Sequence, residues 1–214
     1  SRGLGDVYKR QDNDPGIAEA VRSALAELER AGAKLVTIDV PNLAEMHSLF
    51  RRGGIAGLEF AGFINQPHMR QWKEALDPIV RSRFAAIEAV PATEYIARVM
   101  RIGEMAQEAK QVFEGVDAIV GPTIPISPPK IADLQSVDAY QAKNLLSLRN
   151  TSVGNIFALS GITIPCGLDS AGLPAGLQFL TPGGADEQAL ALGVASEKVL
   201  GDARSRLGTP ALCS

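Results

Sequence analysis

Between residues 15 and 31, apolar residues recur every three or four positions, which is the spacing of an amphipathic helix. An Asp-Pro pair precedes this segment as a start signal, and Gly32 is placed to end it. Residues 34–40, KLVTIDV, form a short β-branched run that a proline closes. The pattern predicts a helix followed by a strand, a unit that suits an α/β layered fold.

The next 75 residues are predicted to be mostly helical. Residues 43–88 carry helical patterns with breaks at Gly53–Gly54 and at Pro67, and residues 91–115 form a long amphipathic helix. Its apolar stripe is Tyr95, Val99, Ile102, Met105, Ala106, Ala109, Val112 and Phe113. The continuous apolar run DAIVGPT, residues 117–123, then predicts a buried strand of the kind found at the centre of a sheet.

Four prolines stiffen the segment GPTIPISPPK, residues 121–130, which continues directly from that strand. Such a segment can be a polyproline ligand for a small domain or a rigid loop at a strand end. Its continuity with a buried strand favours the loop. Loops at the carboxyl ends of strands commonly line sites in α/β folds, so Thr123 is a candidate pocket residue.

The stretch GITIPCGLDSAGLPAGLQFL predicts a β-hairpin with strands over 162–168 and 175–180. Its turn is DSAG, in which Gly172 can adopt a positive φ. The prolines of this stretch cannot donate ladder hydrogen bonds, so we expect them at strand ends, edges or bulges. Gln178, within an apolar strand, is expected to be hydrogen-bonded or to face a polar cavity.

Two helices are predicted to begin at polar residues. Asn150, Thr151 and Ser152 precede an apolar run, and capping of free amide groups explains them most simply. Asp186 is the expected N-cap of a closing helix. Leu190, Val194 and Val199 are expected on the apolar face of that closing helix.

Composition limits the class of protein. The chain has 214 residues, of which 46% are hydrophobic, enough for one globular domain. It contains neither an apolar run of about 18 residues nor a secretion signal, so a cytoplasmic protein without membrane partners is expected. Its two cysteines and two histidines lack metal-ligand spacing, and Cys166 is interpreted as a core residue.

Residues 1–11, SRGLGDVYKRQ, differ from the periodic sequence that follows. DVYKRQ is the translation of one frame of a common transposase sequencing adapter, so the segment is interpreted as an adapter-derived or disordered scar and set apart from the fold. A natural flexible arm is the alternative. Without it the chain has 18 basic and 23 acidic residues, a balance of −5 that argues against direct nucleic-acid binding.

DAIVGPTIP, NTSVGN, GITIPCGLDSAGLPAGLQFL and DEQALALGVASE occur in an order that resembles the carboxyl-terminal half of amidase-signature enzymes. The resemblance covers residues 12–203, and residues 204–214 form a tail without a match. It implies part of an α/β/α layered fold with a mixed central sheet, incomplete at its N-terminal side. It also implies hydrolysis of an amide carbon–nitrogen bond without metal or cofactor.

In this family a serine nucleophile, a second serine preceded by a cis peptide, and a lysine form an acyl-enzyme. The resemblance places all three residues upstream of the part matched here, so no catalytic residue is assigned in this chain. By position it suggests substrate-binding roles for Thr123, Asn150, Thr151, Asn155 and Asp186. Loop stiffening or helix capping explains each of them equally well.

The full-length protein is therefore expected to be an amidase acting on a small-molecule amide, with this fragment inactive alone. The alternatives are the amidase subunit of a tRNA-dependent amidotransferase and a non-catalytic interaction module. An incomplete sheet would leave an unpaired edge and an apolar face, which promote association, for instance as a homodimer.

Overall fold

The computed structural model describes residues 4–6 and 13–209 of the chain. Within these residues the strands form one sheet in the order β2-β1-β3-β5-β4. The strands are β1 (Leu4–Asp6), β2 (Leu35–Thr37), β3 (Ala118–Pro122), β4 (Ser160–Leu168) and β5 (Pro174–Thr181). β1 runs parallel to β2 and β3, whereas β3, β5 and β4 pair antiparallel. The sheet is mixed, as the resemblance implies.

β3 is the middle strand of this sheet, and all five of its residues are buried. Such burial on both faces explains its uninterrupted apolar sequence. The prediction of a central buried strand is confirmed.

β1 comes from the segment that the sequence sets apart. Leu4, Gly5 and Asp6 pair with β2 on one side and with β3 on the other. This differs from the expectation that residues 1–11 lie outside the fold. Pairing in a ladder uses main-chain groups, so a strand position alone does not reveal the origin of these residues. The adapter origin stays a hypothesis.

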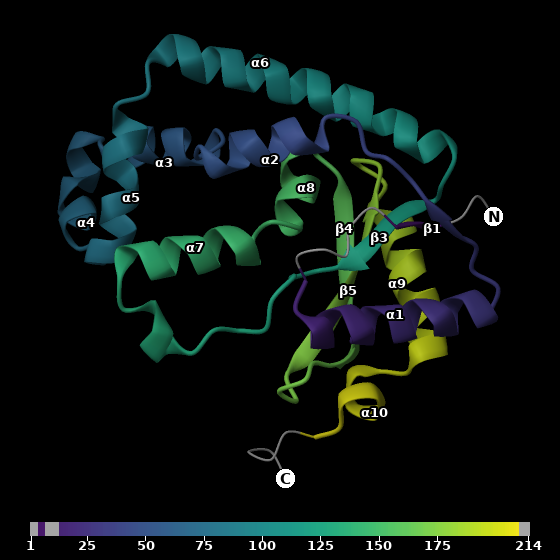
Figure 1. Ribbon diagram of the computed structural model, residues 1–214. Coiled ribbons are helices and arrows are strands. Elements are labelled where there is room, and N and C mark those ends of the chain that lie inside the picture. The colour runs from purple at the N-terminus through teal and green to yellow at the C-terminus, as the bar shows by residue number, and fades with distance from the viewer. Residues whose placement is uncertain (1–3, 7–12, 210–214) are drawn as a thin grey trace.

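Helices cover both faces of the sheet (Figure 1). α1 (Pro15–Arg30) and α9 (Asp186–Leu200) pack on one face, in a cluster with Val120, Leu177 and Phe179. On the other face, α2 (Leu43–Arg51), the C-terminal part of α6 (Ala92–Ala109) and α8 (Thr151–Ile156) form a second cluster around Ile119 and Leu180. This arrangement is the expected α/β/α layering.

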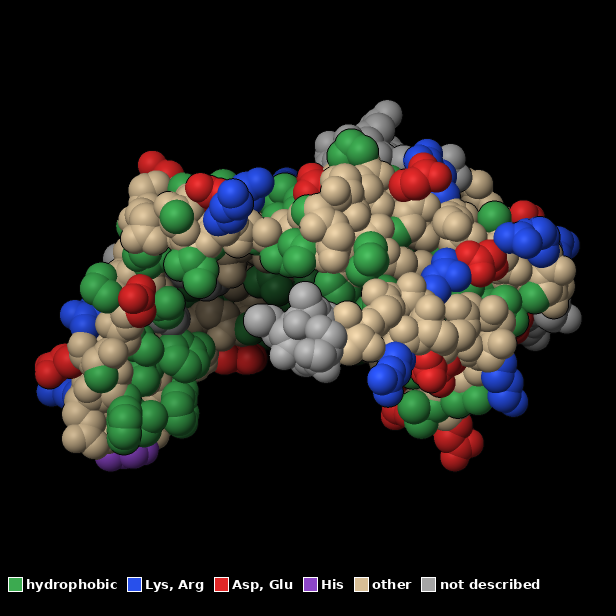
Figure 2. Space-filling view, turned by 90° about the horizontal axis from the view of Figure 1, so that it is seen from below, with side chains coloured by type: hydrophobic (Ala, Val, Ile, Leu, Met, Phe, Trp, Pro, Cys, Tyr) green, Lys and Arg blue, Asp and Glu red, His purple; other side chains and the backbone are tan. Residues whose placement is uncertain are grey.

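Most of the remaining helices form a lobe at one side of the layered body. They are α3 (Ala56–Ile64), η2 (Pro67–Met69), α4 (Arg70–Glu74), α5 (Pro78–Glu88), η4 (Ile131–Leu134) and α7 (Val137–Ser147). The short helix η3 (Lys110–Glu114) instead continues from the C-terminal end of α6, and its Phe113 belongs to the second cluster. α3 to α5 and α7 project at the left of Figure 1, away from the sheet. The breaks between α2 and α3 and after α3 fall at the Gly-Gly pair and the proline predicted from the sequence. From below, Figure 2 shows a hollow between this lobe and the body, with hydrophobic side chains along it.

β4 and β5 form the predicted hairpin. In its turn, Gly172 has a φ of 77°, and the Asp169 Oδ1 atom accepts hydrogen bonds from the backbone N–H groups of Ala171 and Leu173, both at 2.8 Å. Pro165 lies at a register shift in β4, and Pro174 is the first residue of β5. Both prolines thus occupy positions where no ladder donor is lost.

α9 presents a different face to the sheet from the one expected. Its buried residues are Ala189, Gly193, Ser196 and Leu200, whereas Leu190, Val194 and Val199 are 59%, 53% and 41% exposed. A Cβ at Gly193 would lie 2.4 Å from the Cδ1 atom of Ile162, so the small residues let the helix approach β4 closely. Asp186 is also not the N-cap: the N-cap is Ala185, and Asp186 is the first helical residue.

The segment that the sequence leaves as a tail begins with structure. Residues Ala203–Leu207 form α10, in which the Asp202 carboxylate accepts a hydrogen bond from the Ser205 N–H at 2.8 Å. This helix contacts β4. Residues 210–214 lie outside the described residues.

Candidate functional site

Thr123 follows β3 directly, and its side chain lies over Gly176 of the neighbouring strand β5. Its backbone N–H donates to the Gly176 carbonyl at 2.9 Å, and its hydroxyl donates to the Thr163 hydroxyl at 3.1 Å. The two side chains thus bridge β3 and β4 across β5. A Cβ at Gly176 would lie 2.8 Å from the Thr123 Oγ1 atom, so only glycine fits beneath this pair.

Asn150 is fully buried and holds the end of β3. Its Nδ2 atom donates to the Pro122 carbonyl at 2.7 Å, next to Thr123 in the chain. Asn150 has helical backbone angles and makes no side-chain cap hydrogen bond. The capping interpretation of this segment is therefore wrong, because Asn150 satisfies a strand carbonyl instead of helix amide groups. Thr151 and Ser152 likewise donate to carbonyls, those of Leu148 and Arg149.

The proline-rich loop after β3 is held by the start of α1. The Asp14 carboxylate accepts a hydrogen bond from the Ser127 N–H at 2.8 Å, and the Asp14 N–H donates to the Pro125 carbonyl at 2.8 Å. Arg149 adds a second link, donating to Asn150 Oδ1 at 3.1 Å and to Asn13 Oδ1 at 3.0 Å. These contacts fix the loop that carries Thr123.

Gln178 belongs to the same region of the sheet. It pairs with Gly121 of β3 and Thr163 of β4, and it is 8% exposed. Its Oε1 atom is buried without a hydrogen-bond partner in the described part of the chain. Sequence reasoning singled out this glutamine as a polar residue in an apolar strand, but did not include it among the site residues.

His47 of α2 is a second residue with a buried polar atom that lacks a hydrogen-bond partner. Its Nδ1 atom is buried and has no partner in the described part of the chain. Burial lowers the pKa of the imidazole, and the positive charges of Arg149 and Arg51 lower it further. His47 is therefore harder to protonate than an exposed histidine, a property that no spacing in the sequence could reveal.

The structure brings together only two of the five predicted site residues. Thr123 and Asn150 meet at the end of β3, where Asn150 binds the carbonyl that precedes Thr123. Thr151, the next residue in the chain after Asn150, is half-buried at the start of α8, whereas Asn155 and Asp186 are exposed, on α8 and at the start of α9. The substrate-binding role of all five stays a prediction.

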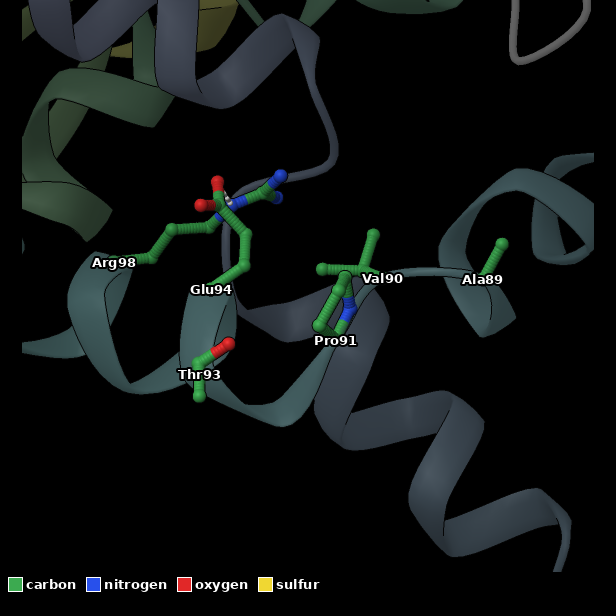
Figure 3. A pocket seen from close by; sticks show the side chains of 6 residues that line it. All are labelled: Ala89, Val90, Pro91, Thr93, Glu94 and Arg98. Carbon is green, nitrogen blue, oxygen red and sulfur yellow. Dashed lines mark hydrogen bonds and ion pairs between the residues drawn. The ribbon is translucent and has the colours of Figure 1, made fainter.

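A cavity of about 530 Å³ lies elsewhere, at the connection between α5 and α6 (Figure 3). The Glu94 and Arg98 side chains turn towards one another there, with Arg98 Nε 2.9 Å from Glu94 Oε1. Arg98 is buried, and it also donates to the carbonyls of Arg52 and Gly54, both at 3.0 Å. These bonds hold the break between α2 and α3, so we assign Arg98 a structural role. None of the five predicted site residues lines this cavity.

Two properties of the described residues bear on the expected partners. These residues contain no group of three or more histidine, cysteine, aspartate or glutamate side chains that could hold a metal ion. Nor does any helix among them combine the length and the apolar character needed to cross a membrane.

Comparison with known proteins decides the family. The family model described as Amidase matches residues 5–190. The chain belongs to the amidase family. The match includes the strands that carry Thr163 and Gln178, together with Thr123 directly after β3 and Asn150 directly before α8.

Individual amidase relatives are longer than this chain. It is 37% identical over 201 residues to 2-amino-5-chloromuconic acid deaminase of Comamonas testosteroni, covering 94% of the chain and 43% of that protein. It is 30% identical over 204 residues to a glutamyl-tRNA(Gln) amidotransferase subunit of Akkermansia muciniphila, covering 84% of the chain and 43% of that protein. The chain thus spans less than half the length of these relatives.

Solved structures agree on the fold. The structure of 6-aminohexanoate cyclic dimer hydrolase matches with a TM-score of 0.81 at 20% identity, covering 95% of this chain and 46% of that one. A crystal structure of an amidase matches with a TM-score of 0.74, also at 20% identity, over 94% of this chain and 46% of that one. The amidase fold expected from the sequence is confirmed.

Proposed function

We propose that this chain is the carboxyl-terminal portion of an amidase that hydrolyses an amide carbon–nitrogen bond through an acyl-enzyme. The family match over residues 5–190 carries the proposal. The nucleophilic serine, the bridging serine and the lysine would lie in the upstream portion. This chain would supply part of the sheet, its core and part of the substrate pocket.

Exposed apolar residues on two helices support the proposal that a further portion of the protein packs against this chain. On α9 they are Leu190 and Val194, and on α6 Ile96 and Met100 are 54% and 64% exposed. Large apolar side chains on an outer helix face normally mark a surface that another part of the protein covers. In an amidase of the relatives' length, the upstream portion is the natural cover for such surfaces.

An activated ester tests the catalytic part of the proposal. The 214-residue chain should give no burst of product with p-nitrophenyl acetate, because no acylatable serine is assigned to it. The longer protein, expressed from genomic DNA that extends upstream, should give a burst and then steady hydrolysis. A burst from the 214-residue chain would overturn the proposed division of the active site.

A deamination activity is the second candidate. The 37% identity to the Comamonas deaminase, against 30% to the Akkermansia amidotransferase protein, favours a substrate related to 2-amino-5-chloromuconic acid. Ammonia release from that compound by the longer protein would support this candidate. Glutamine-dependent activity that requires further subunits would favour the amidotransferase alternative instead.

Association is the expected behaviour of the chain alone. β2 and β4 are the edge strands of the described sheet, and unpaired edges recruit further strands. We expect a homodimer or larger aggregates by size-exclusion chromatography with light scattering. A monodisperse monomer with a sharp unfolding transition would favour the self-sufficient interaction module over a fragment.

A further inference from the structure

One row of residues across β3, β5 and β4 has a glutamine on the middle strand and a glycine, which has no side chain, on β3. Gly121, Gln178 and Thr163 are in register on three adjacent strands, so their side-chain positions share one face of the sheet. The neighbouring row on the same face is Ile119, Leu180 and Gly161. Ile119 and Leu180 belong to the apolar cluster under α2, α6 and α8, and Gln178 is the next residue on that face of β5.

The Oε1 atom of Gln178 is buried at an energetic cost that no hydrogen bond in the described part of the chain offsets. The residue as a whole is 8% exposed. A buried carbonyl oxygen without a donor destabilises the fold, whereas methionine would fill the same space without that penalty. A glutamine at this position is therefore a candidate for function.

On the β3 side of Gln178 lies Gly121, which has no side chain. The space over Gly176, in the next row of β5, is already filled by the Thr123 and Thr163 side chains. Glycines within strands commonly mark places where a ligand or a backbone approaches the sheet. Thr163, on the other side of Gln178, is exposed and accepts the hydrogen bond from Thr123, which leaves its own proton for another acceptor.

These groups complement an amide. A substrate N–H can donate to the Gln178 carbonyl oxygen, and a substrate carbonyl oxygen can accept from the Gln178 NH₂ group or from the Thr163 hydroxyl. The last torsion of glutamine is broad, so the carboxamide can turn either end towards an incoming group. We propose that Gln178 and Thr163 form a hydrogen-bonding site for the amide group of the substrate. This inference rests on the proposed amidase function.

Binding of two small amides to the 214-residue chain tests the site. N-methylacetamide carries one N–H donor, whereas N,N-dimethylacetamide has none. We expect N-methylacetamide to shift the side-chain NH₂ resonance of Gln178 and the methyl resonance of Thr163 in a saturable way, with at least a fivefold weaker effect from the dimethyl compound. The NH₂ resonance of Gln188, which donates to the Asp117 carbonyl, serves as a control that stays unchanged. Equal responses to both amides, or no response, would overturn the proposal.

Substitutions separate a binding role from a structural one. Gln178→Met should abolish the response to N-methylacetamide and leave the melting temperature unchanged or higher, because an unsatisfied buried amide is removed. Gln188→Met is the matched control and should keep the response. A clear loss of thermal stability in Gln178→Met would instead identify Gln178 as a satisfied structural residue and overturn the proposal.

Kinetics of the longer protein give an independent readout that does not require the chain to be stable alone. Gln178→Met should raise the KM for a secondary amide about tenfold, with a smaller change in kcat. An unchanged KM, or an equal loss of kcat for every substrate, would show that Gln178 positions another part of the protein. If the longer protein hydrolyses no amide but the chain still binds N-methylacetamide through Gln178, the proposed function fails and the binding site stands.

Discussion

Arg206 of α10 forms a bidentate salt bridge with Glu27 of α1. Its Nη1 and Nη2 atoms lie 2.8 and 2.7 Å from the two carboxylate oxygens of Glu27, and its Nε atom donates to the Cys166 carbonyl at 3.0 Å. Both side chains are largely shielded, at 18% and 26% exposure. Arg206 therefore ties α10, α1 and β4 together, although it lies beyond residue 190, where the family match ends.

Arg206→Met should destabilise the chain by about 1–3 kcal/mol, because charge-assisted hydrogen bonds to a carboxylate and a carbonyl are lost together. Urea denaturation followed by circular dichroism measures this difference. Arg22→Met is the matched control, since Arg22 pairs with Glu19 on an exposed surface, where such pairs contribute about 0–1 kcal/mol. Equal effects of the two substitutions would contradict the role given to Arg206.

The same bridge predicts a dependence of stability on pH. The hydrogen bonds from Arg206 lower the pKa of the Glu27 carboxyl below its ordinary value of 4.5. A lowered folded-state pKa gives a contribution that is complete above about pH 4.5 and is lost as the pH falls through the folded-state value. The stability difference between the wild type and Glu27→Gln should therefore be largest near neutral pH and shrink in acid. A difference that grows in acid would refute this assignment.

Gly16 marks the contact between the start of α1 and the hairpin turn. A Cβ at this position would lie 2.3 Å from the Ser170 backbone nitrogen, so Gly16→Ala should destabilise the chain by about 1–3 kcal/mol despite the better helix propensity of alanine. Gly103→Ala in α6 is the control: it has open space around its Cβ position and should stabilise by about 0.5–1 kcal/mol. Thermal melts should show a lower melting temperature for Gly16→Ala and a higher one for Gly103→Ala than for the wild type.

Asn150 should matter far more than its neighbour Asn155. Asn150→Ala removes a buried hydrogen bond and leaves the Pro122 carbonyl unpaired, which we expect to cost about 1–3 kcal/mol. Asn155→Ala affects an exposed position and should change stability by less than about 0.5 kcal/mol. Chemical denaturation distinguishes the two. If both variants behave alike, Asn150 does not hold the end of β3 as described.

Cys166 should be an unreactive thiol in the folded chain. Burial raises its pKa to about 11 from an ordinary 9.0, which makes the thiolate fraction roughly 100-fold smaller at neutral pH. Cys213 lies outside the described residues, so the test uses Cys213→Ser to leave Cys166 as the only thiol. Iodoacetamide should then modify the native chain at least 100-fold more slowly than the urea-denatured chain. Comparable rates would mean that Cys166 is accessible.

The N-terminal segment illustrates how far sequence and structure answer different questions. The sequence DVYKRQ suggests an adapter, whereas the structure places Leu4–Asp6 in a sheet position. Parallel pairing depends on the backbone, so a strand position can accept many sequences. Reading the genomic DNA upstream of codon 12 decides the origin: an adapter-free junction there would remove the hypothesis.

The sequence by itself determined the order of the main helices and strands, the hairpin turn at Gly172 and the resemblance to amidases, but neither β1 nor α10. Each of these depends on local periodicity, on turn residues or on segments read in order along the chain. Leu190 and Val194 show the limit of such patterns: they form an apolar stripe, but small residues on the opposite side of α9 pack against β4.

Only the tertiary structure decided what the polar residues do. Asn150 precedes a helix in the chain, yet its side chain binds the carbonyl of Pro122, 28 residues away. Gln178 lies on the strand between β3 and β4, and its Oε1 atom has no hydrogen-bond donor there. Hydrogen-bond partners of this kind are brought together by the packing of distant segments. Their identity follows from the fold as a whole, since local spacing carries no information about which buried groups meet.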